Sequence, residues 1–477
     1  MMKSDRQNTK KEEHRILQEA ASRIPELFTQ NSYVEDDALL RNFGIVIPNK
    51  SRFPLGYLKL WPQDFIVEEV STAGEVSTVD MGTRLSSESP LEFSPTTYAT
   101  LVKCSVSTIE VVDDLARELE CDKKSIGFAG IKDKDALTAQ RISFRKISRQ
   151  KLKEISSPYF FLKDVTTSNG SVATADLRGN RFTILIRTEN GFFEQKNFGF
   201  FVENLKNIQE HGFYNFFYLQ RFGTPRLVNY TWALSILRGE YEKAVFDILT
   251  YAAPRELPYF QQLRNESKEY FGDWKKVEEI FSPFPIIFRH ELKLIEHLKN
   301  EPDDYIGALT QIPDQVSLWI YALASKYFNE RISLSIESGE DLPKKLPLFL
   351  SFDKHDWQPY ENEMRRDGIF PPPFANLKPF PLIQMRHREV STRDHAEILG
   401  VQPTEHGLIL SFELSKGQYA TTFLSHLFNL VSGKVPDFLS TEKIDVKQVL
   451  GKESLSETLQ YFNSVTHSKI ETASPEE

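Results

Sequence analysis

Residues 127–140 read GFAGIKDKDALTAQ, and this stretch carries the strongest indication of the fold. Two glycines bracket an apolar pair, and two lysines and two acids then precede a threonine and a glutamine. Taken alone, a KDKD run is most simply a polar surface turn. The glycine spacing matches neither a phosphate-binding P-loop nor a complete dinucleotide fingerprint. By itself, therefore, the stretch does not identify a chemistry.

The surroundings of this stretch are basic, although the whole chain has a formal charge of −9. A run of charges is usually only a solvated face. Here the run surrounds the motif, and a local basic surface favours RNA binding even in an acidic protein. Between residues 122 and 154 only four acids stand against the basic residues Lys123, Lys124, Lys132, Lys134, Arg141, Arg145, Lys146, Arg149, Lys151 and Lys153.

A second segment, NFFYLQRFGTPR at residues 215–226, mixes an amide, four aromatic rings and two arginines. An amide can read a base edge, a ring can stack on a base, and an arginine can pair with phosphate. The alternative is an aromatic core segment with polar ends, which is the more frequent reason for such a composition.

The composition is that of a globular protein long enough, at 477 residues, for two or three domains. The 36 phenylalanines predict a large aromatic core, and two cysteines imply neither a disulfide framework nor a thiolate metal site. The histidines are scattered, so no metal is expected. Because the start is charged and no apolar run reaches the roughly 18 to 20 residues needed to span a bilayer, we expect a cytoplasmic protein without membrane association.

Periodicity predicts strands on both sides of a helical block. Residues 181–187 alternate as a half-buried strand should, and residues 408–414 place four apolar side chains on one face. The proline-rich residues 371–381 cannot form a helix or a central strand. This order predicts an α+β domain with another domain inserted. Further strands are expected at 65–70 and 98–106, and helices at 109–119, in the first fifty residues, throughout 230–370, and after a turn within 416–431.

Together, the two motifs resemble the signatures of the TruD family of tRNA pseudouridine synthases. Residues 127–140 resemble the family's signature loop, and NFFYLQRFG at 215–223 resembles its second signature. Three further stretches resemble family elements: LKLWPQDFIVEE at 58–69, LRGNRFTILIR at 177–187 and FELSKGQYATTFL at 412–424. All five stand in family order.

The resemblance implies a pseudouridine synthase catalytic domain with a mixed, mainly antiparallel sheet, interrupted by a mostly helical, family-specific insertion. We therefore expect an N-terminal helical or flexible extension at 1–50, the catalytic domain at 51–229 and 386–450, the inserted domain at 230–385, and a C-terminal helix and acidic tail at 451–477.

The resemblance also implies an activity: isomerisation of uridine to pseudouridine in tRNA, with uridine 13 as the family's usual target and no cofactor. Asp133 matches the catalytic aspartate, Phe217 the ring that stacks on the uracil, and Asn215 a residue that shapes the catalytic loop. Lys132 and Arg221 are further substrate-binding candidates. Residues expected to brace the loop are Gly130, Thr138 and Gln140.

A buried carboxylate needs a nearby cation to remain charged. In an extended loop, alternation would send Lys132 and Lys134 away from Asp133. We therefore predict that the partner comes from another segment, and Lys59, which matches a family lysine before the first strand, is the best candidate. The alternative is that Lys59 contacts only phosphate or solvent.

One departure from the family is Tyr218, which stands where glycine is usual. Either its ring narrows the base pocket or the backbone does not need a positive φ there. Another is Asp135, which adds negative charge to the loop.

Two other functions stay open. One is an RNA-binding or RNA-folding protein with weakened catalysis, which Tyr218 alone supports. The other is a glycosidic hydrolase, which would need a second acid that no motif supplies. For a pseudouridine synthase, and equally for an RNA-binding or RNA-folding protein, the expected partner is tRNA or another structured RNA. Basic residues that could contact phosphate from the insertion are Lys344, Lys345, Arg365, Arg366, Arg386 and Arg388.

Overall fold

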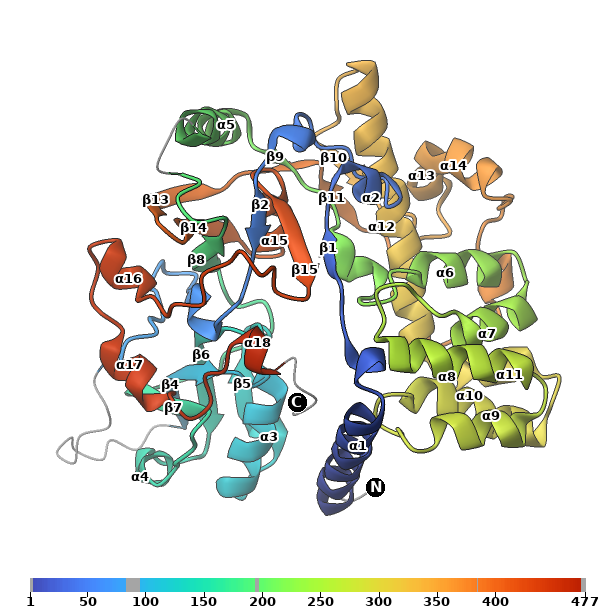
Figure 1. Cartoon of the computed structure of the whole chain (residues 1–477), viewed down its shortest axis with the longest axis horizontal. Helices are drawn as coiled ribbons and strands as arrows, with labels where there is room; N and C mark the ends of the chain where they lie inside the picture. Colours follow the sequence, from blue (N-terminus) through green and yellow to red (C-terminus); the bar gives the residue numbers. More distant parts are fainter. Residues whose placement is uncertain (1–2, 83–94, 194–196, 384, 473–477) are drawn as a thin grey trace. The chain divides into compact units, whose positions relative to one another are not determined.

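The computed structural model describes residues 3–82, 95–193, 197–383 and 385–472, and the chain divides into two compact units (Figure 1). Residues 52–213 and 394–472 form the first, which we call the sheet unit. Among the described residues, 3–51 and 214–393 form the second, the helical unit. The assignment of segments to a catalytic and an inserted domain at 229/230 and 385/386 stays a prediction.

The sheet unit is built on one mixed, mainly antiparallel sheet, which confirms the predicted α+β class. Its strands are ordered β15-β2-β8-β3-β6-β4-β7, and β14 pairs with both β8 and β13, while β5 pairs with β6. Only the β15–β2 and β3–β6 pairs are parallel. The bounds are β2 Leu55–Tyr57, β3 Phe65–Val70, β4 Thr96–Cys104, β5 Ile126–Phe128, β6 Leu137–Arg145, β7 Phe160–Ser168, β8 Gly179–Arg187, β13 Glu397–Thr404, β14 Gly407–Ser415 and β15 Asn429–Gly433.

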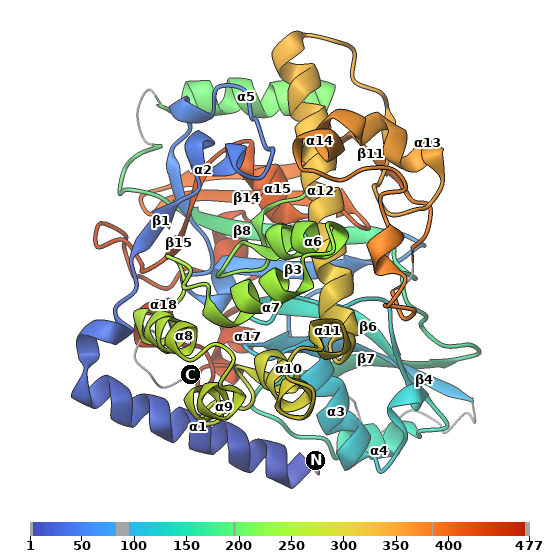
Figure 2. The same cartoon turned by 90° about the vertical axis from the view of Figure 1, so that its right-hand side faces the viewer.

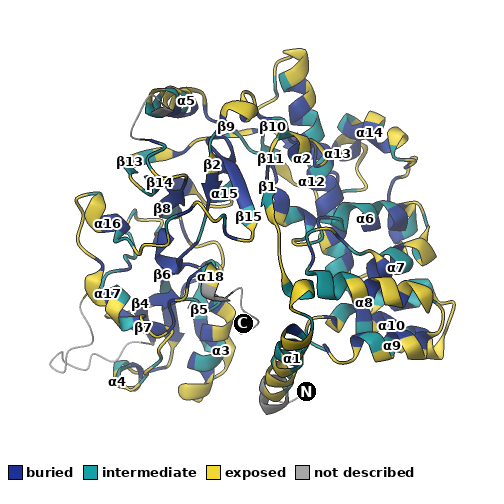
Figure 3. Cartoon of the chain, viewed as in Figure 1, coloured by how far each residue is buried: buried dark blue, intermediate teal, exposed yellow. Residues whose placement is uncertain are grey.

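Strand β8 is buried on both faces, so the expected half-buried character of residues 181–187 is wrong. Its alternate residues enter two different cores. Leu185 packs with Ile66 on one face, whereas Phe182 stacks on Phe412 on the other, with ring centroids 5.2 Å apart. Periodicity cannot report the second layer that covers the polar-looking face, and Figure 3 shows β8 as buried along most of its length.

Helix α3 (Thr108–Glu118) covers one face of β4, β6 and β7. It begins with a capping box, in which Ser107 and Glu110 satisfy each other's backbone amides, and its apolar stripe includes Val111 and Leu115. The C-terminal helices cover the opposite face, where Phe462 contacts Phe161. The remaining bounds are α4 Arg149–Lys153, α5 Asn197–His211, α15 Ala420–Ser425, α16 Val446–Val449, α17 Ser456–Tyr461 and α18 Lys469–Thr472.

The helix expected within residues 416–431 is short. This helix is α15, which ends at Ser425. Residues 429–433 instead form strand β15, which pairs parallel to β2. The amide of Asn429 donates to the carbonyl oxygen of Pro54 at 2.7 Å and starts this pairing. The pairing with β2, which is far away in sequence, therefore decides the conformation of residues 429–433.

The helical unit confirms the predicted helical block. Figure 2 shows the long helix α12 (Pro313–Ser338) running beside α6 (Asn229–Leu237). Residues 371–381 form neither an α-helix nor a strand, as predicted, but include one 3-10 turn. The other helices are α1 Lys3–Arg23, α2 Asp37–Arg41, α7 Tyr241–Thr250, α8 Pro258–Glu269, α9 Trp274–Phe281, α10 Arg289–Asn300, α11 Tyr305–Thr310, α13 Lys354–Trp357 and α14 Glu361–Arg366.

Short elements complete the chain. Strand β10 pairs antiparallel with β11 in the helical unit, and β9 and β12 lie where the chain passes between the units. No helix in the described ranges is both long and apolar enough to cross a membrane. The bounds are β1 Ser32–Val34, β9 Phe213–Tyr214, β10 Lys345–Pro347, β11 Glu389–Ser391, β12 Arg393–Asp394, η1 Pro25–Phe28, η2 Lys50–Arg52, η3 Pro62–Asp64, η4 Lys123–Ser125, η5 Leu219–Phe222, η6 Gln358–Tyr360 and η7 Ala375–Leu377.

The N-terminal segment is packed onto the helical unit rather than flexible throughout. Asn329 on α12 donates to the carbonyl oxygen of Phe43 at 3.1 Å, and Ser333 donates to that of Gly44 at 2.7 Å. The ring of Phe43 also packs on Phe222, with centroids 4.8 Å apart.

A fully buried ion pair anchors the turn before β3. The guanidinium of Arg187 donates to both carboxylate oxygens of Asp64, at 2.7 and 2.9 Å, and neither side chain is exposed. Asp64 also accepts the amide of Trp61 at 3.1 Å, and Arg187 donates to the carbonyl oxygens of Ser440 and Glu442. The pair therefore joins the 61–64 turn, the end of β8 and the loop after β15.

We expect the Arg187→Met substitution to lower the free energy of unfolding by about 3–5 kcal/mol, because it leaves the Asp64 carboxylate buried without its cation. Urea unfolding followed by circular dichroism measures the change. The control is Arg117→Met, which removes an exposed pair with Asp114 and should leave the midpoint unchanged. Equal effects of the two substitutions would contradict this assignment.

Candidate active site

Residues 131–133 of the loop between β5 and β6 alternate between the surface and the interior, and residues 134–136 form a bend. Ile131 is 67% exposed, Lys132 is buried, and Asp133 is partly exposed. The expected alternation directs the carboxylate of Asp133 away from the side of Lys132, but it does not extend to Lys134, which is exposed like Asp135.

The ammonium of Lys132 lies in the interior, 2.6 Å from a carboxylate oxygen of Glu69 on β3. The exposed fractions of these two side chains are 4% and 3%. The other oxygen of Glu69 accepts the amide of Arg141 at 3.1 Å, and the amide of Lys132 donates to the hydroxyl of Thr108 at 3.0 Å. Both the side chain and the backbone of Lys132 are thus fixed by partners inside the fold.

The carboxylate of Asp133 pairs with Lys59, as predicted from the alternation. The Nζ–Oδ1 distance is 2.7 Å, and the exposed fractions are 15% for Lys59 and 40% for Asp133. The ammonium also lies 4.3 Å from the ring centroid of Phe65, a cation–π contact. Lys59 has a φ of 59°, in the left-handed region that non-glycine residues seldom adopt. The surrounding turn therefore holds a strained residue in this position.

Two lysines that sequence reasoning missed, one fully buried and one partly buried, support this pair. The first, Lys103 on β4, donates to the carbonyl oxygens of Asp133 at 2.6 Å and Val106 at 2.9 Å. Burial lowers the pKa of Lys103 to about 8, although the charge of Asp133 opposes that shift. The available signal was a lysine inside the otherwise apolar strand 98–104.

The second, Lys469 on α18, holds the turn of Lys59. Its amide donates to the carbonyl oxygen of Leu60 at 2.9 Å, and its ammonium donates to that of Leu58 at 3.2 Å. Burial lowers the pKa of Lys469 to about 8. Nothing in the local sequence indicates this role, because Lys469 is distant from the turn along the chain.

The structure shows a bracing contact for Gln140. Its amide donates to the carbonyl oxygen of Gly130 at 3.0 Å, and its side-chain oxygen accepts the hydroxyl of Thr108 at 3.2 Å. Thr138 is fully buried on β6, and its hydroxyl has no hydrogen-bond partner within the described part of the chain. Gly130 and Gln140 thus belong to the loop's support, whereas no hydrogen bond from the Thr138 hydroxyl reaches that loop among these residues.

Asn215 and Phe217 lie together in the helical unit. The amide side chain of Asn215 donates to the carbonyl oxygen of Ser391 at 2.9 Å. Asn329 grips the backbone of Phe217 from both sides, since it accepts its amide at 2.9 Å and donates to its carbonyl oxygen at 2.8 Å. The ring of Phe217 packs edge-on against Phe328, with centroids 5.3 Å apart.

Arg221 lies 5.3 Å from the ring centroid of Phe217, and its amide donates to the carbonyl oxygen of Tyr218. Tyr218 has a φ of −85°, so the backbone there does not need the positive φ that glycine would allow. Its hydroxyl donates to Glu35 at 2.7 Å, and burial raises the pKa of Tyr218. The ring is therefore anchored to the N-terminal segment.

Among the basic residues expected to contact phosphate, Arg366 is already paired with acids. Its guanidinium lies 3.0 Å from Glu330 and 2.9 Å from Asp367. Lys344, Arg365 and Arg388 are exposed.

The candidate residues thus form two groups, each within one unit. In the sheet unit, the loop of Gly130, Lys132 and Asp133 is joined to Lys59 and Gln140. In the helical unit, Asn215, Phe217 and Arg221 share one segment. The first group offers a partly exposed carboxylate beside a cation, and the second a ring beside a guanidinium.

A family model described as tRNA pseudouridine synthase D (TruD) matches residues 54–348. The "Probable tRNA pseudouridine synthase D" of Methanococcoides burtonii is 31% identical over 244 residues, which are 50% of this chain and 54% of that protein. Its namesake from Methanococcus vannielii is 28% identical over 381 residues, which are 77% of this chain and 93% of that protein. The chain therefore spans about half of the first relative and nearly all of the second.

A crystal structure described as that of a tRNA pseudouridine synthase D from Methanosarcina mazei has a similar fold. The TM-score is 0.64 with 22% sequence identity, and the match covers 81% of this chain and 97% of that chain. At this identity the match shows the fold alone.

Two predictions follow from the buried lysines. Lys132→Met should lower the free energy of unfolding by about 3–5 kcal/mol, because it strands the Glu69 carboxylate in the interior. The double substitution Lys132→Met with Glu69→Leu removes both charges and should recover most of that loss. Urea unfolding measures all three proteins. Additive losses in the double variant would contradict a coupled pair.

Lys103 should make stability depend on pH in the alkaline range. Its pKa is about 8 when folded and about 10.4 when unfolded, so the unfolded chain binds more protons between these values. The cost of burying its charge is therefore complete below pH 8 and disappears as the pH rises to about 10. The unfolding free energy of the native chain minus that of Lys103→Met should increase over this range in urea titrations. A constant difference would contradict the lowered pKa.

Proposed function

The chain belongs to the TruD family of tRNA pseudouridine synthases, and from this premise we propose that it isomerises uridine to pseudouridine in tRNA, with Asp133 as the catalytic carboxylate. The observation that carries the proposal is the Lys59–Asp133 pair, 2.7 Å long and still partly open to the surface. Such a carboxylate has a cation beside it and remains accessible to a substrate.

The proposed reaction breaks the bond between ribose C1′ and uracil N1, turns the base, and joins C1′ to C5. The proton on C5 leaves, and N1 ends with a proton, so the isomerisation is redox-neutral. Asp133 either attacks C1′ directly or assists elimination to a glycal. In both cases the carboxylate must lie close to the sugar, and the target nucleotide must leave its stack.

We propose that Lys59 stabilises the negative charge of the Asp133 carboxylate. Its ammonium lies between the carboxylate and the ring of Phe65, and a cation held in this way offsets the cost of a partly desolvated anion. A substrate-binding role for Lys59 would require the pair to open, since the side chain of Lys59 is only 15% exposed.

We assign Lys132, Lys103 and Gln140 to positioning the loop. Glu69 holds the ammonium of Lys132. Lys103 donates to the carbonyl oxygen of Asp133, and Gln140 donates to that of Gly130. Each contact fixes the backbone on one side of the carboxylate, which aims Asp133 without touching substrate. The substrate contact expected for Lys132 is thus replaced by a supporting role in this proposal.

Base recognition is proposed for the helical unit. The clamped backbone of Phe217 keeps its ring in place, which suits stacking on an extruded uracil. Arg221 beside this ring can meet a phosphate, and Asn215 shapes the segment through Ser391. Uridine 13 of tRNA is the proposed target, and the cytoplasm, where tRNA is used, is the proposed location.

The weakened-catalysis alternative loses its only support. Tyr218 was its basis, and the structure gives that ring a buried partner, Glu35, and an ordinary extended backbone. The loop of Asp133 is at the same time braced through Lys132 and Gln140.

The test is the Asp133→Asn substitution. We expect pseudouridine formation in a tRNA transcript to fall by at least roughly 10³-fold, the scale on which removal of a catalytic nucleophile acts in other enzymes. In cells, the pseudouridine map of a strain with Asp133→Ala should lose at least one site that the intact gene restores. Affinity for the tRNA should stay within a few fold.

The matched control is Asp135→Asn, which removes an exposed acid two residues away in the same loop. This variant should retain activity within a few fold. Unchanged maps in the Asp133→Ala strain, or equal losses in the two variants, would overturn the proposed role of Asp133.

A further inference from the structure

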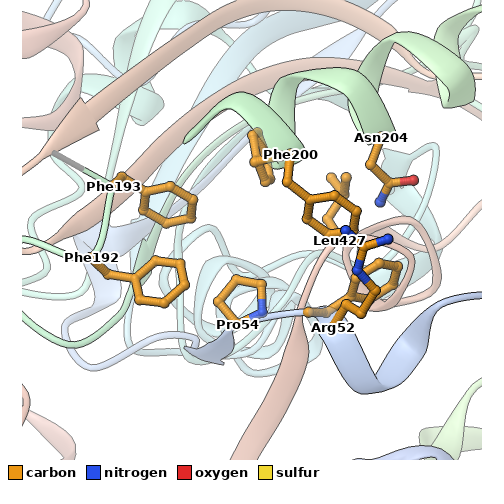
Figure 4. A pocket seen from close by; sticks show the side chains of 9 residues that line it. Arg52, Pro54, Phe192, Phe193, Phe200, Asn204 and Leu427 are labelled. Atoms are coloured by element: carbon orange, nitrogen blue, oxygen red, sulfur yellow. The ribbon is translucent and has the colours of Figure 1, made fainter. Parts of the chain in front are cut away.

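A ring-lined pocket lies in the sheet unit, apart from the loop of Asp133. Its volume is about 210 Å³, and it opens between the start of β2, the segment after β8 and helix α5. Figure 4 shows Phe192 and Phe193 on one side of the opening and Phe200 and Arg52 on the other. The pocket is defined here by Phe192, Phe193, Phe200, Phe201, Arg52 and Asn204.

The walls of this pocket are held by contacts of their own. Phe193 packs on Phe201 with centroids 5.4 Å apart, and Phe201 packs on Phe428 at 5.7 Å. Asn204 ties α5 to the sheet, since its amide donates to the carbonyl oxygen of His426 at 2.9 Å. Little ordering is therefore needed when a ligand enters.

The chemistry of the walls favours a flat aromatic ligand with a negative charge. The guanidinium of Arg52 lies 4.1 Å from the ring centroid of Phe200, so a ring face and a cation meet at the opening. Arg52 is the one charged residue among the nine that line the pocket. A nucleotide combines both features, because its base stacks on rings and its phosphate pairs with arginine.

The pocket lies on the same face of the sheet as Lys59. The Lys59 ammonium lies over the ring of Phe65. Phe65 is paired with Ile184 on β8, so the two side chains point to the same face of the sheet. Ile186, two residues further along β8, points to that face as well. Phe428 packs beside Ile186, since a β-carbon at Gly56 would lie 2.7 Å from Ile186 and 2.9 Å from Phe428.

The pocket is also near Lys59 along the chain. Pro54, another lining residue, precedes Lys59 by five residues, which span at most roughly 18 Å. One RNA strand can therefore reach both places within a few nucleotides.

We propose that this pocket takes a second unstacked base of the RNA, with its phosphate beside Arg52, while the target uridine is held at Asp133. The inference rests on the proposed function for the identity of the RNA. It adds a subsite that would fix which uridine reaches the carboxylate.

The experiment pairs protein and RNA changes. Unmodified tRNA transcripts, each with one abasic nucleotide outside the target uridine, are bound to full-length Asp133→Asn protein with and without Phe200→Ala. At one position the abasic change should raise Kd by about 5- to 150-fold, the range of base–aromatic stacking. With Phe200→Ala, the same change should add no further loss.

Arg52→Ala should weaken binding. It should also lower the slope of log Kd against log salt by about 1, the contribution of one phosphate contact. Phe438→Ala is the matched control: it removes an exposed phenylalanine of the same unit that does not line the pocket, and it should leave the coupling intact. Thermal unfolding of each variant verifies folding.

Additive losses at every abasic position would overturn the pocket proposal. Because binding is measured without turnover, the two proposals fail separately. If the native chain forms no pseudouridine although the coupling is present, the proposed function fails and the pocket stands. If pseudouridine forms but no position couples to Phe200, the pocket proposal fails alone.

Discussion

The buried ion pair between Lys132 and Glu69 is the constraint on which the candidate active site depends. Desolvating two charges is costly, so the pair tolerates little displacement once it is formed. Because residues 131–133 alternate, fixing Lys132 inward sends Asp133 outward. The Asp133 carboxylate therefore lies on the side of the loop that faces Lys59. A charged contact inside the fold in this way determines the direction of the Asp133 carboxylate.

Sequence reasoning reached the parts of this arrangement that follow from local rules. Alternation predicted that Lys132 would turn away from Asp133, and motif order pointed to Lys59 and to a mixed sheet. It missed Lys103 and Lys469, whose contacts are backbone carbonyls brought near only by folding. It also misjudged β8, since an alternating pattern cannot reveal that both faces of the strand are covered. Local patterns report a residue's own conformation, whereas these contacts depend on distant segments.

Two kinds of support thus surround the carboxylate. Charged pairs and hydrogen bonds hold the loop from within the sheet, through Glu69, Thr108 and Gln140. Lys59 is held differently, by a strained backbone, a ring and a C-terminal helix. The first kind fixes where Asp133 is, and the second fixes the charge it meets. Either could be altered without the other, which separates placement from electrostatics in this fold.

The hydrogen bond between Tyr218 and Glu35 has a consequence for the history of the family. In this chain the phenol at position 218 has an acceptor because the N-terminal segment supplies Glu35. Position 218 and residues 32–36 should accordingly vary together when related chains are aligned. An N-terminal extension gained by one lineage would leave its trace inside a signature motif, as a single bulky residue in place of the smallest one.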